Sequence, residues 1–298
     1  MPPENISEIC VNALKQAYYI QKKLLEEKII AELVSVGRGE DRATKGDWES
    51  EEVVISYLKK ENFPGKIISE EHGQIDIIKN PGYLAILDGI DGSSGLVKNQ
   101  ETRCGTILTV SDSLKPTYDD FIFSGITEFV SDRIVYGLKG EGVWLIENVG
   151  KNEKITKLPN FQEKNKSFPE KIIKIDCYNV SYADGITKGM NQFEEFMAEK
   201  VVSKLEGKMK LTGSITHSEM CLDLLLGEID AVAHVVAKGV FEPPNLYLMT
   251  KELGGWVSDL KGNDLRNREW KPVGMNIDGA IFASSREIGR KIISYLNR

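Results

Sequence analysis

The chain has 298 residues, of which 41% are hydrophobic, and it carries a formal net charge of −7. This size and composition are those of a globular protein with one large core or two linked cores. The acidic balance excludes a basic nucleic-acid-binding footprint, and no apolar run is long enough to predict a membrane span. A small anionic substrate would need local positive charge, from a metal ion or a helix N-terminus.

The four cysteines lack metal-site spacing, and a chain of this length needs no disulfide framework, so free thiols in a reducing compartment are expected. The first residues are acidic and contain no long apolar run, so we expect no signal peptide and a cytoplasmic location. The three histidines are scattered, and we expect them to be surface or core residues.

The first half predicts helices followed by a sheet. Apolar residues recur with helical spacing from residue 6 to 24, which predicts an amphipathic helix over 4–33. A charged loop over 35–50 would precede a second helix over 49–60. Two short strands, 65–69 and 83–88, are each followed by acids. Further apolar runs lie too close together for helices between them and predict an antiparallel sheet. These runs are 104–110, 121–127, 133–139 and 142–147.

The pattern changes after a polar, basic stretch at 150–171, so we place a domain boundary between residues 148 and 149. Strands and helices alternate beyond it, which favours an α/β second half. The expected strands are 171–176, 208–213, 229–236, 256–260 and 279–284. The expected helices are 188–205, 214–227, one that begins at the Pro243-Pro244 pair, and one that runs to Arg298.

Acids follow several of these strands, and the segment Leu84–Gly95, LAILDGIDGSSG, holds two of them, Asp88 and Asp91. Neighbouring strand ends would bring these acids close to Glu70 and Glu242, where they repel one another unless a hard cation such as Mg²⁺ joins them. A helix that starts near Gly92 would direct free N–H groups at an anion. Together these features indicate phosphate-ester hydrolysis. The alternative is a set of solvated loop acids with an ordinary helix cap.

These residues resemble the inositol monophosphatase superfamily, most closely its archaeal members that act on inositol phosphate or fructose 1,6-bisphosphate. The resemblance rests on the run Asp88–Ser93, on Ser69-Glu70-Glu71 after a strand, and on Asp47 near a helix start. A Gly-Ser pair before a helix, Gly213-Ser214, and the late acid Glu242 follow in the family's order. The likeness covers nearly the whole chain.

The resemblance implies three groups of site residues. Oxygen ligands for two Mg²⁺ ions would come from Glu70, Asp88, the carbonyl of Ile90, Asp91 and Glu242. The attacking water would be oriented and deprotonated by Ser93 paired with Asp47, beside Glu70. The phosphate and the sugar would be held by Gly92, Ser93, Ser94, Gly213, Ser214 and Lys238. A third, weaker ion would lie near Glu70 and the 36–46 segment.

Two positions depart from the family pattern. Gly89 stands where the family has proline, which removes rigidity from the turn but leaves the Ile90 carbonyl available. Glu242 replaces the usual aspartate and Phe241 the usual tryptophan. Glutamate is one methylene longer, so either the second ion or the backbone would have to shift. The alternative for Glu242 is an acid that only favours the dipole at a helix start.

The fold that the resemblance implies is a layered αβαβα sandwich (α/β, α+β), with an antiparallel sheet in the first half and a smaller mixed sheet in the second. The implied activity is Mg²⁺-dependent hydrolysis of a small sugar or inositol phosphate, by in-line attack of water without a covalent intermediate, in a homodimer. Two alternatives stay open: a 3′-phosphoadenosine 5′-phosphate nucleotidase, and a metal-binding regulatory relative without turnover.

Overall fold

The computed structural model describes residues 3–34, 43–161, 168–176, 200–214, 216–234, 241–272 and 279–298. The first-half elements are α1 (Pro3–Glu26), α2 (Lys45–Lys60), β1 (Gly65–Ser69), β2 (Gly73–Asp76), β3 (Tyr83–Asp91), α3 (Ser93–Lys98), β4 (Gly105–Ser111), β5 (Phe121–Glu128), β6 (Arg133–Leu138), β7 (Gly142–Glu147) and β8 (Lys154–Lys157). The second-half elements are β9 (Ile172–Asp176), β10 (Lys210–Ser214), α6 (His217–Leu225), β11 (Ala231–His234), α7 (Glu242–Glu252), β12 (Trp256–Asp259), β13 (Ala280–Ala283) and α8 (Arg286–Leu296). Only residues 200–205 of the helix expected over 188–205 are described, and they are helical.

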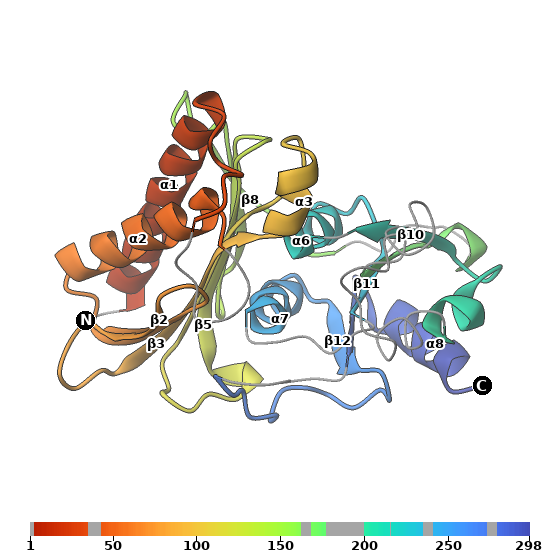
Figure 1. Ribbon diagram of the computed structural model, residues 1–298. Helices are drawn as coiled ribbons and strands as arrows, with labels where there is room; N and C mark the ends of the chain where they lie inside the picture. The colour runs from red at the N-terminus through yellow and green to blue at the C-terminus, as the bar shows by residue number, and fades with distance from the viewer. Residues whose placement is uncertain are drawn as a thin grey trace.

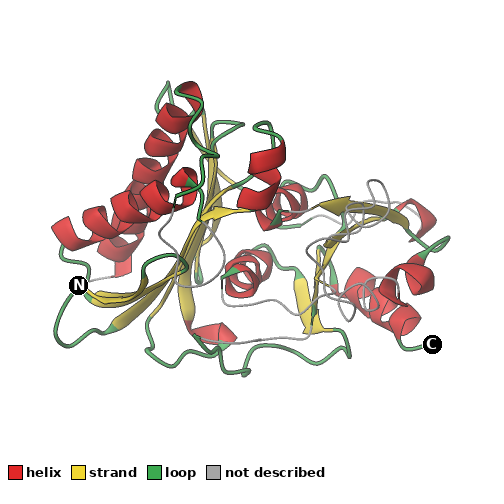
Figure 2. Ribbon diagram, viewed as in Figure 1, coloured by secondary structure: helices red, strands yellow, loops and turns green. Residues whose placement is uncertain are grey.

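The elements stack in five layers, as the resemblance implied (Figure 1). Helices α1 and α2 cover one face of an eight-stranded sheet with the order β2-β1-β3-β4-β5-β6-β7-β8. Helices α6 and α7 lie between this sheet and a five-stranded mixed sheet with the order β10-β9-β11-β13-β12. Helix α8 covers the outer face of the smaller sheet (Figure 2). No helix in the described part of the chain is long and apolar enough to cross a membrane.

Apolar side chains fill each interface between layers. The expected stripe on α1 is confirmed, because Ile6, Cys10 and Leu14 are buried against the large sheet. The middle helices contribute Met220 and Leu246 to the core between the two sheets. Three cysteines, Cys10, Cys104 and Cys221, are buried free thiols, as expected, and Cys177 lies outside the described residues.

Three sequence expectations about the first half were wrong in detail. Helix α1 ends at Glu26, seven residues earlier than predicted, because Lys28 adopts a left-handed φ of 62° and the Ile29 N–H bonds back to the Leu24 carbonyl. Helix α2 begins at Lys45, inside the predicted loop. The large sheet is not wholly antiparallel, since β1 and β3 run parallel.

Candidate active site

Parallel pairing of β1 with β3 brings Glu70 beside Asp88. Ser69 lies opposite Leu87 in the register, so the next residue of each strand is an acid. The Glu70 N–H donates to the Leu87 carbonyl at 3.1 Å, which fixes the backbone just after β1. The two carboxylates therefore arrive at the same edge of the sheet from segments that are 18 residues apart.

A β-bulge turns Asp88 and Asp91 to the same side. On a regular strand, residues three apart point to opposite faces. Asp88 pairs with Ile107 and Asp91 with Gly105, so three steps on β3 match two steps on β4. The extra residue restores the same facing for both acids. Strand β3 thus continues through Asp91, beyond the predicted end at Asp88.

The first turn of α2 carries Asp47 to this edge. Thr44 caps the helix and exchanges hydrogen bonds with Asp47, whose carboxylate accepts the Thr44 N–H at 3.1 Å and its hydroxyl at 2.6 Å. The Ser93 hydroxyl also hydrogen-bonds to Asp47, so the structure brings together the pair that the sequence predicted. Burial nevertheless raises the pKa of Asp47 to about 6.

Gly89 explains how closely α2 approaches β3. A Cβ atom at residue 89 would lie 2.3 Å from the Asp47 carbonyl oxygen, so only glycine fits the present spacing. The Gly89 carbonyl accepts hydrogen bonds from the buried Gln21 amide at 3.2 Å and from the Thr106 hydroxyl at 2.7 Å. The departure from proline is therefore matched by a close helix–strand contact, and hydrogen bonds hold the turn.

Helix α7 supplies the late acid. It begins at Glu242, one residue before the predicted start at Pro243-Pro244, with both prolines in its first turn. Phe241, at the position of the family's tryptophan, packs on an apolar cluster that includes Ile86 and Trp270. Glu242 is close enough to Glu70 and Asp88 for its charge to raise the pKa of each.

The acids form one electrostatic cluster. Burial and repulsion by the neighbouring acids raise the pKa of Asp88 well above its ordinary value. The contributing acids, in decreasing order, are Glu70, Asp91, Asp47 and Glu242. Burial of the carboxyl group and the charges around it likewise raise the pKa of Glu70 to about 8. The residue as a whole is exposed, so water screens part of this repulsion.

The donor chemistry of the cluster fits a hard divalent cation. One buried oxygen of Asp88, Oδ1, has no hydrogen-bond partner among the described residues. The charged side chains that raise the pKa of Asp88 are carboxylates, whose oxygens could bind a metal ion. Oxygen ligands of this kind suit Mg²⁺, which would remove the repulsion between them. Within the described ranges, however, no three His, Cys, Asp or Glu side chains already form a ligand set, so side chains would have to turn toward an ion.

Helix α3 begins two residues after Asp91, and the start of α6, from the second half, contacts both Gly92 and Asp91. Gly92 has a φ of 85°, and a Cβ there would lie 2.4 Å from Cγ2 of Thr216, the residue that caps α6. The Ser218 N–H, in the first turn of α6, donates to Asp91 Oδ2 at 2.7 Å. Asp91 is thus tied to the second half of the chain before any ion is bound.

The remaining predicted site residues are less closely joined to the acids. Ser94 is exposed on α3, and Gly213 lies on β10. The buried Ser214 hydroxyl bonds to Glu219 and accepts the Thr216 N–H, so in this structure it organises the start of α6. Ile90 is buried beside Gly46 in the bulge. Lys238 and residues 36–42 of the third-ion segment lie outside the described residues.

Sequence reasoning missed two supporting groups of residues. The buried Glu51 pairs with the partly buried His72 beside Glu70, with His72 Nδ1 2.9 Å from a Glu51 oxygen, and this hydrogen bond raises the pKa of His72. The sequence signal that could have identified Glu51 is its spacing, because Glu51 lies four residues after Asp47 and so on the same helix face. The second group joins the two halves through ion pairs among Arg103, Glu128, Asp223, Lys174 and Glu219.

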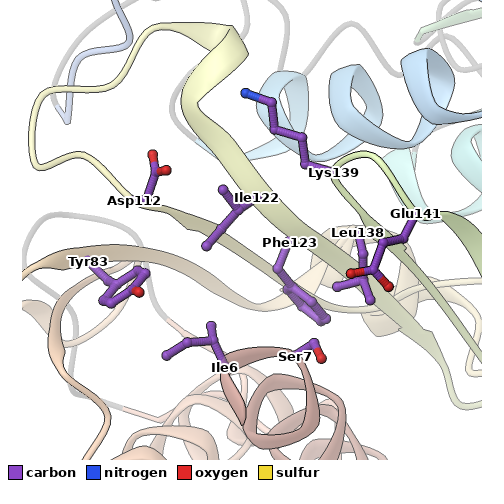
Figure 3. A pocket seen from close by; sticks show the side chains of 9 residues that line it. All are labelled: Ile6, Ser7, Tyr83, Asp112, Ile122, Phe123, Leu138, Lys139 and Glu141. Carbon is purple, nitrogen blue, oxygen red and sulfur yellow. The ribbon is translucent and has the colours of Figure 1, made fainter. Parts of the chain in front are cut away.

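A separate cavity of about 220 Å³ lies at the far end of the large sheet (Figure 3). Its apolar side chains come from the start of α1 and from the strands, and Tyr83 lines it. Tyr83 begins β3 whereas Asp91 ends it, so the cavity is eight residues of strand away from the acid cluster. None of the predicted site residues lines it.

Comparison with known proteins gives a partial match in sequence and a nearly full-length match in structure. No protein-family profile matches it. A fructose-1,6-bisphosphatase/inositol-1-monophosphatase of Methanothermobacter thermautotrophicus is 22% identical over 145 residues, which cover 47% of this chain and 52% of that protein. The chain thus matches about half the length of this curated relative.

Solved structures match over nearly the full length. An IMPase of Thermotoga maritima aligns with a TM-score of 0.68 at 14% identity, over 97% of this chain and 96% of that one. The extragenic suppressor protein SuhB of Bartonella henselae aligns with a TM-score of 0.71 at 13% identity, over 99% of both chains. An IMPase/NADP phosphatase complexed with Mg²⁺ and phosphate aligns with a TM-score of 0.68 at 16% identity, over 99% and 96%. The chain therefore has the inositol monophosphatase fold, and the resemblance to that superfamily found in its sequence is confirmed.

Proposed function

We propose that this protein is a Mg²⁺-dependent phosphomonoesterase that hydrolyses small sugar or inositol phosphates, such as inositol monophosphate or fructose 1,6-bisphosphate. The observation that carries the proposal is the meeting of five acids from four separate segments at one sheet edge, where each raises the pKa of Asp88 or is Asp88 itself. Such a cluster is unfavourable without a cation, and its oxygen donors suit Mg²⁺. The fold match and the curated relative support a phosphatase of this class.

Each group of residues would have a distinct task. Glu70, Asp88, Asp91 and Glu242 would hold the ions, together with the Ile90 carbonyl. Bound Mg²⁺ would supply charge stabilisation for the phosphoryl oxygens and lower the pKa of the attacking water. Asp47, which already accepts the Ser93 hydroxyl, would orient that water through Ser93 and accept its proton. Its pKa of about 6 leaves it ionised at neutral pH.

The substrate would bind where the two halves meet. The N–H groups of Gly92 and Ser93 would hold the phosphate, and Ser94, Gly213, Ser214 and Lys238 would contact the rest of the substrate. Positioning by these groups would align the ester with the water for in-line attack. We further propose that the protein is cytoplasmic and forms a homodimer. Analytical ultracentrifugation would test the homodimer.

Phosphate release from a panel of substrates tests the activity. Inositol 1-phosphate, fructose 1,6-bisphosphate and 3′-phosphoadenosine 5′-phosphate would each be assayed with Mg²⁺ and with EDTA. We expect Mg²⁺-dependent release from at least one sugar or inositol phosphate, and none from an Asp91→Asn variant. Release from the nucleotide alone would replace the sugar-phosphate assignment. Mg²⁺ binding without release from any substrate would favour a regulatory protein.

A further inference from the structure

Glu51 is a fully buried carboxylate that the proposed chemistry does not use. It lies on α2, one helical turn after Asp47, and faces the turn that follows β1. Its oxygens accept the N–H groups of Glu70 at 3.0 Å, Glu71 at 3.1 Å and His72 at 3.3 Å. The turn is therefore folded around one carboxylate.

Two side chains complete the shell around Glu51. The Ser69 hydroxyl donates to Oε2, and His72 Nδ1 lies 2.9 Å from the same oxygen. Trp48 packs on the His72 ring with 4.0 Å between ring centroids, which fixes the imidazole against α2. A buried charge is tolerated only when it is hydrogen-bonded in this way, so the shell and the carboxylate depend on each other.

The turn that Glu51 holds carries Glu70 into the acid cluster. The Glu70 N–H is shared between the Glu51 carboxylate and the Leu87 carbonyl, so both α2 and β3 fix its backbone. The charges of Asp47, Glu51 and Glu242 repel the Glu70 carboxylate, so hydrogen bonds to the backbone are needed to keep this side chain beside Asp88. A cation ligand must be held in place against that repulsion before the ion arrives.

We propose that Glu51 is a positioning residue that aims Glu70 at the cation site. This inference rests on the proposed function, because it assumes that Glu70 is an ion ligand. Since Asp47 and Glu51 share one face of α2, a single helix sets both the residue proposed to accept the proton and the first ligand. Glu51 touches neither the ion nor the substrate in this role and acts only through the turn.

The test compares Glu51→Gln with Glu52→Gln, measured first as Mg²⁺ binding by calorimetry without substrate. Glutamine keeps the shape of Glu51 but lacks one acceptor oxygen and the charge. Glu52 is the matched control because it is 57% exposed and contacts only the far side of His72 among these residues. We expect Mg²⁺ binding to weaken about 10- to 100-fold in Glu51→Gln and to stay within twofold of the wild type in Glu52→Gln. At saturating Mg²⁺, phosphate release by Glu51→Gln should recover to within a few-fold of the wild type.

A merely structural role would give a different result. It would lower the melting temperature of Glu51→Gln while leaving Mg²⁺ affinity unchanged well below that temperature, and this result would overturn the proposal. If Glu51→Gln does not fold, Ser69→Ala removes one donor to the carboxylate and should weaken Mg²⁺ binding about 5-fold. Unchanged binding there also overturns it. Wild-type Mg²⁺ binding without phosphatase activity would refute the proposed function but leave the Glu51 test intact, whereas no wild-type binding refutes both.

Discussion

Replacing Gly89 by alanine tests how closely α2 packs against the bulge of β3. The new Cβ would lie 2.3 Å from the Asp47 carbonyl oxygen and 2.8 Å from its carbonyl carbon. Ordinary contacts between such atoms are well over 3 Å, so the start of α2 would have to retreat by about 1 Å. Gly46 makes that retreat unfavourable, because it is itself packed between Ile30 and Ile90 and the helix is pinned by the Thr44 cap.

The size of the effect follows from this geometry. Overpacking of a rigid contact destabilises by about 1–3 kcal/mol. For a chain of this length, that lowers the melting temperature by roughly 2–10 °C. A 1 Å displacement of Asp47 and its bond to Ser93 is expected to reduce kcat by about 100-fold. Gly89→Pro, which introduces the family's own residue, also adds a Cβ and should fare no better here.

Thermal unfolding followed by circular dichroism, with phosphate release at saturating Mg²⁺, measures both effects. Gly82→Ala is the matched control, because Gly82 immediately precedes the same strand and the nearest atom to its added Cβ is 3.9 Å away. It should leave activity unchanged and stability equal or slightly higher. A Gly89→Ala protein whose melting temperature stays within 1 °C and whose kcat stays within twofold of the wild type would refute the reasoning.

The other predictions concern charge. Asp91→Asn should lower phosphate release at least about 100-fold, yet leave the metal-free melting temperature equal or higher, because one repelling charge is gone. In EDTA, the melting temperature should fall as pH rises from 5 to 9. Folding raises the pKa of Asp47 from 3.8 to about 6 and that of Glu70 from 4.5 to about 8. The folded protein therefore binds protons more tightly than the unfolded chain, and it loses stability as these groups ionise. Glu70→Gln should flatten that dependence, and a rise with pH would contradict it. Arg103→Met should destabilise by about 3–5 kcal/mol in urea unfolding, because it leaves the fully buried Glu128 without its cation and removes the ion pair to Asp223 in the second half. A change below about 1 kcal/mol would count against a role of Arg103 in joining the halves.

The elements that could be predicted are those whose pattern is local. The apolar stripe of α1, the hairpin strands β6 and β7, and the proline-led start of α7 each follow from neighbouring residues. The end of α1 could not be located, because Lys28 occupies the left-handed position where glycine is the usual signal. The capping pattern from Thr44 to Asp47 is present in the sequence, but the charged and glycine-containing residues around it favour a loop prediction.

The arrangement of the site depended on non-local pairing. The sequence contains the acids, but nothing in it shows that β1 pairs parallel to β3, because the short strand β2 lies between them in the chain. The bulge that aligns Asp88 with Asp91 arises from the register with β4, which only the folded sheet defines. Glu51 was overlooked for a related reason, since its partners follow another strand and become neighbours only on folding.

The middle layer has a consequence for dividing the chain. Helices α6 and α7 come from the second half of the sequence, yet α7 packs on β5 and β6 of the first-half sheet as well as on β12 and β13. A fragment that stops near residue 150 would expose one apolar face of that sheet to solvent, because Met249 and its neighbours would be missing. We therefore expect neither fragment to fold on its own. The two fragments should fold only when they are present together, either in one polypeptide or co-expressed.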